Sequence, residues 1–218
     1  GARDTGRPGL ALQQAIQCLL DRFDSVAAAV AWLQESQVQI IPLEIGGKPG
    51  TGHISLADAG GDSAIVEFLS GRASIHHGPE FTVMANSPAY GEQLELLRRY
   101  SGLGGDDPLP GGTDSPDRFA RAAYYSAHLP PTSSPREAVA EVFSVIRNAS
   151  APFGTVDAAR PNISTTRWRT VADITSRGYF FESTLSPNLV WVPLAGLDLA
   201  PGPELVFDPS ADVAVGGD

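Results

Sequence analysis

The stretch of sequence that decides the fold is HISLADAGGDSAIVEFLSGRASIHHGPEFTVM, residues 53–84. Its apolar residues fall in short runs, and the breaks between the runs have the Gly, Asp, Ser and Pro content of hairpin turns. Runs of this length and spacing are typical of strands that follow one another in a sheet. The stretch therefore predicts an antiparallel meander with strands at 53–57, 64–68, 73–75 and 81–84.

The sequence on either side of the meander adds helices and further strands. Before it, apolar spacing predicts a helix at 10–23, a second helix capped at Asp24-Ser25 and a strand near 38–41. Beyond it, the predicted helices are 90–100, 118–128 and 135–147, and the predicted strands are 164–174, 178–184, 189–193 and 205–207. This order predicts an α+β fold, an αββα four-layer sandwich in which helices cover two antiparallel sheets. Residues 1–218 contain no linker, so we expect a single domain.

Charge and composition argue against several classes of partner. The net charge is −10, and Lys48 is the only lysine among 15 basic residues, so no basic cluster is available for nucleic acid or an anionic membrane. No apolar run approaches the roughly 18 residues of a membrane span. Cys18 is the only cysteine, and the four histidines lack metal-ligand spacing, so we expect neither metal nor cofactor.

Three positions are candidates for chemistry. Cys18 lies within the first predicted helix next to Leu19 and Leu20, which predicts a packing role rather than a reactive thiol. Asn86 ends the last predicted strand of the meander, where its amide is equally suited to capping the loop or to donating a hydrogen bond to an oxyanion. Arg118 opens a predicted helix, where a cation opposes the helix dipole unless it has an anionic partner or another task.

Several short segments, taken together and in order, carry a family resemblance. They are FDSV at 23–26, HISLAD at 53–58, AIVE at 64–67, ANSP at 85–88, DRF at 117–119, STTRW at 164–168 and YFFEST at 179–184. Together they resemble the choloylglycine hydrolase and penicillin V acylase family, the cysteine-dependent amidases of the N-terminal nucleophile superfamily. The resemblance implies the same αββα layering that the order of elements predicts.

The resemblance also implies a mechanism and site residues. The family's catalytic cysteine is the first residue of the mature chain, attacks a linear amide and forms a thioester. Asn86 matches the family asparagine that stabilises the oxyanion, and Arg118 matches the arginine of the polar network around the nucleophile. Tyr90, Phe153 and Trp168 are expected to line the site for an apolar acyl group.

This sequence departs from the family at its start, because Gly1 corresponds to a position well inside family members. The chain therefore resembles the C-terminal two-thirds of a member, and we expect a larger subunit whose partner chain carries the N-terminal cysteine. The alternative is a piece of a longer chain. A higher homo-oligomer of such heterodimers is also allowed.

The local sequence at 143–148 and 166–170 is closer to the penicillin V acylase-like bacterial branch than to bile salt hydrolases. The expected substrates are small acyl amides of the penicillin V, N-acyl homoserine lactone or conjugated bile acid type, and the expected location is periplasmic or secreted. Two alternatives remain: a non-catalytic binding scaffold of the same fold, and a biosynthetic acyltransferase of the superfamily.

Overall fold

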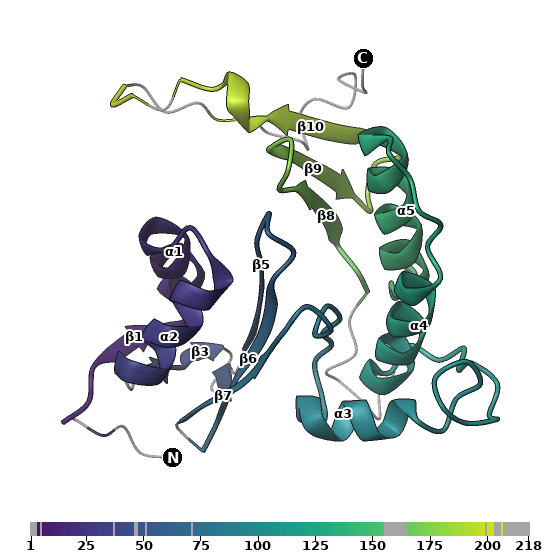
Figure 1. The fold of residues 1–218 in the computed structure, drawn as a ribbon, viewed down its shortest axis with the longest axis horizontal. Helices are drawn as coiled ribbons and strands as arrows, with labels where there is room; N and C mark the ends of the chain where they lie inside the picture. Colours follow the sequence, from purple (N-terminus) through teal and green to yellow (C-terminus); the bar gives the residue numbers. More distant parts are fainter. Residues whose placement is uncertain are drawn as a thin grey trace. The chain divides into compact units, whose positions relative to one another are not determined.

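The computed structural model describes residues 4, 6–36, 38–45, 48–50, 52–70, 72–154, 165–198, 200–202 and 206. The chain divides into two compact units, residues 1–96 and 97–218. Each unit contains a three-stranded antiparallel sheet with helices packed against it (Figure 1). The predicted α+β class is therefore confirmed, whereas the four-layer stacking and the single domain stay predictions.

The first unit is built around the predicted meander. Its elements are β1 (Gly9–Ala11), α1 (Leu12–Arg22), α2 (Val26–Ser36), β2 (Gln39–Ile41), β3 (Leu43–Ile45), β4 (Lys48–Gly50), β5 (His53–Ala57), β6 (Ser63–Leu69), β7 (Arg72–His77) and α3 (Tyr90–Leu97). Strands β5, β6 and β7 form one antiparallel sheet, β3 and β4 pair as a hairpin, and β1 pairs in parallel with β2. The second unit begins at the end of α3.

The β5–β6–β7 sheet has two chemically different faces because successive side chains of a strand point to opposite sides. One face is apolar and packs against α1 and α2; it includes Ile54, Leu56, Ala64, Val66, Phe68, Ala73 and Ile75. The ladder aligns His53 with Glu67 and Glu67 with Ser74 on the other face. A row of polar side chains therefore crosses the face opposite the two helices.

A single carboxylate joins the start of α2 to the turn after β5. The Asp58 Oδ2 atom accepts the N–H of Val26 at 2.9 Å, and Oδ1 accepts the N–H of Gly60 at 2.8 Å and of Asp62 at 3.3 Å. These hydrogen bonds lower the pKa of Asp58, and the one from Val26 has the largest effect. Partial burial acts in the opposite direction and raises the pKa. The helix begins at the predicted place, with an acceptor that comes from a distant turn.

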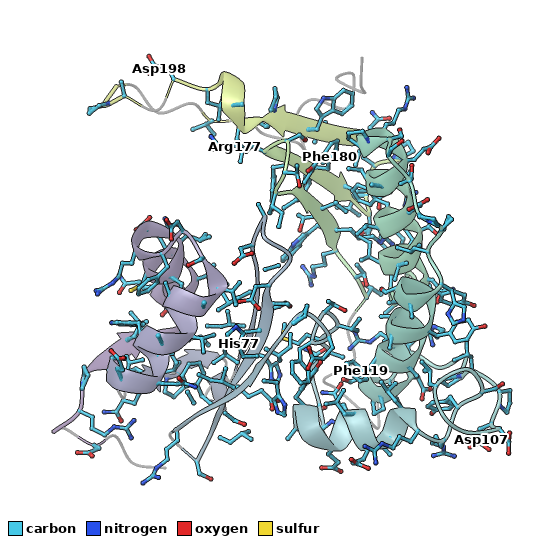
Figure 2. The ribbon with its side chains drawn as sticks, in the orientation of Figure 1. His77, Asp107, Phe119, Arg177, Phe180 and Asp198 are labelled. Atoms are coloured by element: carbon cyan, nitrogen blue, oxygen red, sulfur yellow. The ribbon has the colours of Figure 1, made fainter. Side chains whose placement is uncertain are left out.

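The second unit places a helix pair on one face of the other sheet. Its elements are α4 (Ser115–Ala127), α5 (Pro135–Asn148), β8 (Trp168–Asp173), β9 (Gly178–Ser183), β10 (Leu189–Pro193) and the 3₁₀ turn η1 (Leu194–Gly196). Helix α5 packs against α4 and against β8. Val139 and Phe143 of α5 bury Val171. Phe180 of β9, which is labelled in Figure 2, packs beside them. Phe143 is 2% exposed, so this contact is a centre of the unit's core.

Several predicted elements differ from the observed ones. The segment 81–85 has no regular structure, so the predicted strand at 81–84 is wrong: its alternating pattern has no ladder partner among the described residues. Helix α4 begins at Ser115 rather than Arg118, because Pro116 suits the first turn of a helix. The short strand β1 occupies the start of the predicted helix 10–23. The predicted strand at 205–207 lies largely outside the described residues.

The predicted cap of α5 is confirmed and gives a stability test. The Ser134 Oγ atom accepts the N–H of Glu137 at 3.3 Å, while Thr132 Oγ1 donates to Glu137 Oε2 at 2.6 Å. We expect Ser134→Ala to lower the free energy of unfolding by about 1 kcal/mol, since one N–H of the first turn loses its acceptor. Ser144→Ala, at an exposed position of the same helix, is the control and should change it by less than about 0.5 kcal/mol. Equal effects of the two variants in urea unfolding of the protein would contradict this role of the cap.

Candidate active site

Asn86 lies on a loop that leads into α3, not at the end of a strand as predicted. It is exposed, and the Ser87–Pro88 peptide bond that follows is cis. Tyr90 then begins α3, and the N–H of Gln93 donates to the carbonyl of Ala89 at 3.0 Å, which is the first hydrogen bond of the helix. The exposed side chain of Asn86 therefore lies four residues before the first residue of helix α3.

The start of α3 is held by a buried carboxylate on β6. Glu67 is 2% exposed, its Oε2 accepts the N–H of Tyr90 at 2.9 Å, and its Oε1 lies 3.2 Å from Nδ1 of His53. A buried charge is tolerated only with partners of this kind. The first N–H groups of a helix lack partners within the helix and carry a partial positive charge, so a carboxylate is a favourable partner there. Glu67 was not among the residues predicted for the site.

Gln93 holds the same segment from inside the helix. Its side chain is buried, with the residue 1% exposed, and Nε2 donates to the carbonyl of Pro88 at 2.6 Å. Its Oε1 atom is buried and has no hydrogen-bond partner among the described residues. A buried amide oxygen without a partner is unusual, because such a group costs about 1–3 kcal/mol. Gln93 was not predicted for the site either.

Tyr90 is buried, although we predicted that it contacts substrate. It is 2% exposed, and its ring packs edge-on against His76 at 4.8 Å and Phe81 at 6.1 Å between centroids. Burial, followed by the charges of Glu67 and Glu80, raises the pKa of Tyr90 above its ordinary value of 10.0. The ring thus packs the start of α3 onto the polar face of the sheet, and a substrate contact stays a prediction.

Arg118 lies in the first turn of α4, half-buried beside a second arginine. Its Nε donates to the carbonyl of Thr113 at 3.1 Å. Burial lowers the pKa of Arg118, the neighbouring charge of Arg121 lowers it further, and Asp114 acts in the opposite direction. Burial, a like charge and the helix dipole all oppose a guanidinium at this position, and its positive charge is suited to stabilise a nearby negative charge.

Arg121, one turn further along α4, organises the loop before the helix. It is 8% exposed, and Nη1 donates to the carbonyls of Pro110 at 3.0 Å and Gly112 at 2.7 Å. Its Nε donates to Oδ1 of Asn148 at 3.0 Å, and Nη2 donates to the Asn148 carbonyl at 3.2 Å, at the C-terminus of α5 where a cation is favoured. Arg121 therefore joins the loop, α4 and α5, and it was not predicted.

Phe153 and Trp168 are exposed aromatic residues of the second unit. They are 63% and 60% exposed. Each lies two residues after a member of the pair Ala151 and Thr166, which are hydrogen-bonded to each other. The N–H of Ala151 donates to Thr166 Oγ1 and the N–H of Thr166 donates to the Ala151 carbonyl, both at 3.0 Å. Exposed aromatic rings next to a fixed main chain are suited to contact an apolar group.

The predicted site residues fall into two groups. Asn86 and Tyr90 belong to the first unit, whereas Arg118, Phe153 and Trp168 belong to the second. Cys18 lies in the middle of α1 and is partly buried. Among the described residues, no group of three or more His, Cys, Asp or Glu side chains is placed to hold a metal ion. In the same part of the chain, no helix has the length and apolar character needed to cross a membrane.

Comparison with known proteins identifies the family. Residues 2–208 match the linear amide C–N hydrolases of the choloylglycine hydrolase family. The chain belongs to this family. It is 39% identical over 209 residues to a penicillin V acylase from Pectobacterium atrosepticum, an alignment that covers 89% of this chain and 56% of that protein.

Solved structures of family members share the fold. The structure of penicillin V acylase from Agrobacterium tumefaciens is 44% identical with a TM-score of 0.80, over 92% of this chain and 61% of that one. Two variants of conjugated bile acid hydrolase from Clostridium perfringens are 16% and 17% identical, each with a TM-score of 0.72 over 91% of this chain and 66% of theirs. At that identity the likeness concerns the fold alone. The chain thus spans less than two-thirds of the penicillin V acylases that it matches.

Proposed function

We propose that this chain is part of a hydrolase that cleaves a linear amide through a thioester formed on a cysteine outside these 218 residues. The family match over residues 2–208 carries the proposal. The mid-helix, partly buried position of Cys18 supports the placement of the nucleophile elsewhere. The predicted second chain that carries the cysteine, the higher oligomer and the periplasmic or extracellular location belong to this proposal as expectations.

In the proposed reaction the thiolate attacks the amide carbonyl carbon. A C–S bond forms, the carbonyl electron pair moves to the oxygen, and the amide N–H of Asn86 donates to the resulting oxyanion. The C–N bond then breaks as the amine takes a proton, which leaves a thioester. Water attacks the thioester, releases the carboxylic acid and restores the thiol. Arg118 supplies a positive charge to the polar network around the sulfur.

We propose an apolar, aromatic acyl group as the substrate class, with phenoxyacetyl amides such as penicillin V first. Two relatives, at 39% and 44% identity, are penicillin V acylases, whereas the bile acid hydrolases compared are 16% and 17% identical. The exposed rings of Phe153 and Trp168 offer surface of the right kind for such a group. Fatty acyl homoserine lactones are the second candidates because they join a linear amide to an apolar acyl chain.

Mass spectrometry of the complete protein tests this function. On rapid quenching with phenoxyacetyl, fatty acyl and bile acyl amides, we expect an acyl adduct on the cysteine outside these residues, release of free acid and no adduct on the Cys18 peptide. An adduct on Cys18 would overturn the placement of the nucleophile. Transfer of the acyl group to an added amine, without free acid, would favour the acyltransferase. No adduct and no amine release from any of these amides would favour the scaffold.

A further inference from the structure

We infer that Gln93 and Glu67 are positioning residues that fix the main chain at 88–90 and, through it, the side chain of Asn86. This inference rests on the proposed function of Asn86 as the oxyanion donor. Both are buried polar side chains that were not predicted from the sequence and that take no direct part in the proposed reaction.

The main-chain groups that are held belong to the three successive residues 88–90, which begin two residues after Asn86. The Pro88 carbonyl accepts the side chain of Gln93 at 2.6 Å, the Ala89 carbonyl accepts the main-chain N–H of Gln93 at 3.0 Å, and the Tyr90 N–H donates to Glu67 at 2.9 Å. Three successive residues thus each have a main-chain group held by a buried partner. The nearest of these anchors is two residues from Asn86.

The anchors themselves belong to rigid elements. Glu67 lies on β6, the central strand of its sheet, where the ladder pairs it with His53 on one side and Ser74 on the other. Gln93 lies within the first turns of α3 and is almost fully buried. Side chains on strands and helices hold a site to closer tolerance than side chains on loops. The exposed loop therefore takes its geometry from two regular elements beneath it.

The unsatisfied oxygen of Gln93 favours a functional reason for this residue. An apolar side chain of similar length would fill this buried helix position and would contain no polar atom that needs a partner, unlike Gln93 with its Oε1. An unsatisfied buried group in a native structure needs an explanation. The hydrogen bond to the Pro88 carbonyl supplies one, since only a donor such as the Nε2 amide can orient that carbonyl.

The expected effect follows from the geometry that an oxyanion donor requires. A displacement of about 1 Å at a catalytic group lowers the rate by up to about 100-fold. In the complete active protein we expect Gln93→Met, which keeps the volume and removes the donor, to lower kcat about tenfold while KM changes less than about threefold. We expect the Tm of this variant to stay within a few degrees, because the unpaired oxygen is removed as well.

Three further variants separate positioning from simple structural support. Leu94→Ala, on the same helix, should lower the Tm and leave kcat within about twofold. Glu67→Gln retains an acceptor for the Tyr90 N–H and should retain most of the activity. Glu67→Met removes that acceptor and should lower kcat as Gln93→Met does. If Gln93→Met does not fold, the comparison of the two Glu67 variants decides the question.

A double variant shows whether Gln93 acts through Asn86. Asn86→Ala/Gln93→Met should have the kcat of Asn86→Ala alone, because a displaced loop has no effect once the donor is gone. Additive losses would overturn the inference. If Asn86→Ala abolishes activity but Gln93→Met is fully active, the inference is overturned and the proposed function stays intact. Full activity of Asn86→Ala would overturn the proposed role of Asn86 and this inference with it.

Discussion

Replacement of Asn86 by alanine is expected to lower kcat about 100-fold or more in the complete protein, equivalent to about 2.7 kcal/mol of transition-state stabilisation. The amide N–H of Asn86 is proposed to meet the negative charge that develops on the carbonyl oxygen. Since that charge is absent from the bound substrate, KM should change less than about threefold. The measurement is steady-state release of amine from a phenoxyacetyl amide.

Two variants sharpen this test. Asn86→Asp keeps the shape of the side chain but replaces the donor with a negative charge, so it should be at least as damaging as Asn86→Ala. Gln14→Ala removes an exposed amide from α1 and should leave kcat unchanged. A fall of less than about threefold for Asn86→Ala would reject the oxyanion role. Asn86 would then be a loop residue, which is the other interpretation that its sequence context allows.

The sequence predicted those parts of the fold that local signals specify. The turn at Gly60-Gly61-Asp62 separates β5 from β6 as expected, and β5 has the predicted bounds. Ser134 caps α5 and Pro135 begins it, because an N-cap acceptor and a proline in the first turn are both set by short-range chemistry. Such elements are predictable because the residues that define them are neighbours in the chain.

Features that depend on distant pairing were missed. The segment 81–84 has the alternation of a strand but no ladder partner among the described residues. Conversely, Gly9–Ala11 forms a strand only because it pairs with Gln39–Ile41. A strand forms only when two segments pair, and the sequence pattern of one segment does not show whether a partner segment lies beside it.

The candidate site shows the same division. Asn86 and Arg118 were candidates from their local sequence, and the resemblance assigned their roles; only the family level of that resemblance has been confirmed. Glu67 had a local signal, since it is the one carboxylate in a strand whose other side chains are mostly buried and apolar. Gln93 had none, because a glutamine in a helix is ordinary until the fold shows that it reaches back to Pro88. A residue that acts through a contact distant in sequence, as Gln93 does, is thus harder to predict than a residue with a local sequence signal.

Glu182 is expected to give the largest effect on stability. Its carboxylate on β9 binds two arginines: Oε1 lies 2.7 Å from Nη2 of Arg147, and Oε2 lies 2.9 Å from Nη1 of Arg169. The side chains of Glu182 and Arg169 are 12% and 18% exposed, whereas that of Arg147 is 50% exposed. Glu182→Gln leaves Arg169 largely buried without its counter-charge, so we expect a loss of about 3 kcal/mol in the free energy of unfolding near neutral pH.

This loss should depend on pH in a defined direction. Burial raises the pKa of Glu182, but the hydrogen bonds and charges of Arg147 and Arg169 outweigh burial and hold the pKa below its ordinary value of 4.5. A carboxyl group whose pKa is lower in the folded state stabilises the fold above the unfolded pKa. That stabilisation disappears as the pH falls through the folded pKa. The difference between the parent protein and Glu182→Gln should therefore be full near pH 7 and shrink below about pH 4.5.

Urea unfolding of both proteins at several pH values measures this difference directly. Glu35→Gln, at an exposed position of α2, is the control and should change stability by less than about 0.5 kcal/mol at every pH. Arg169→Met should be more damaging than Arg147→Met, because the half-exposed Arg147 is screened by solvent. A Glu182→Gln difference that stayed constant down to about pH 3 would show that packing, rather than the ion pairs, accounts for the effect.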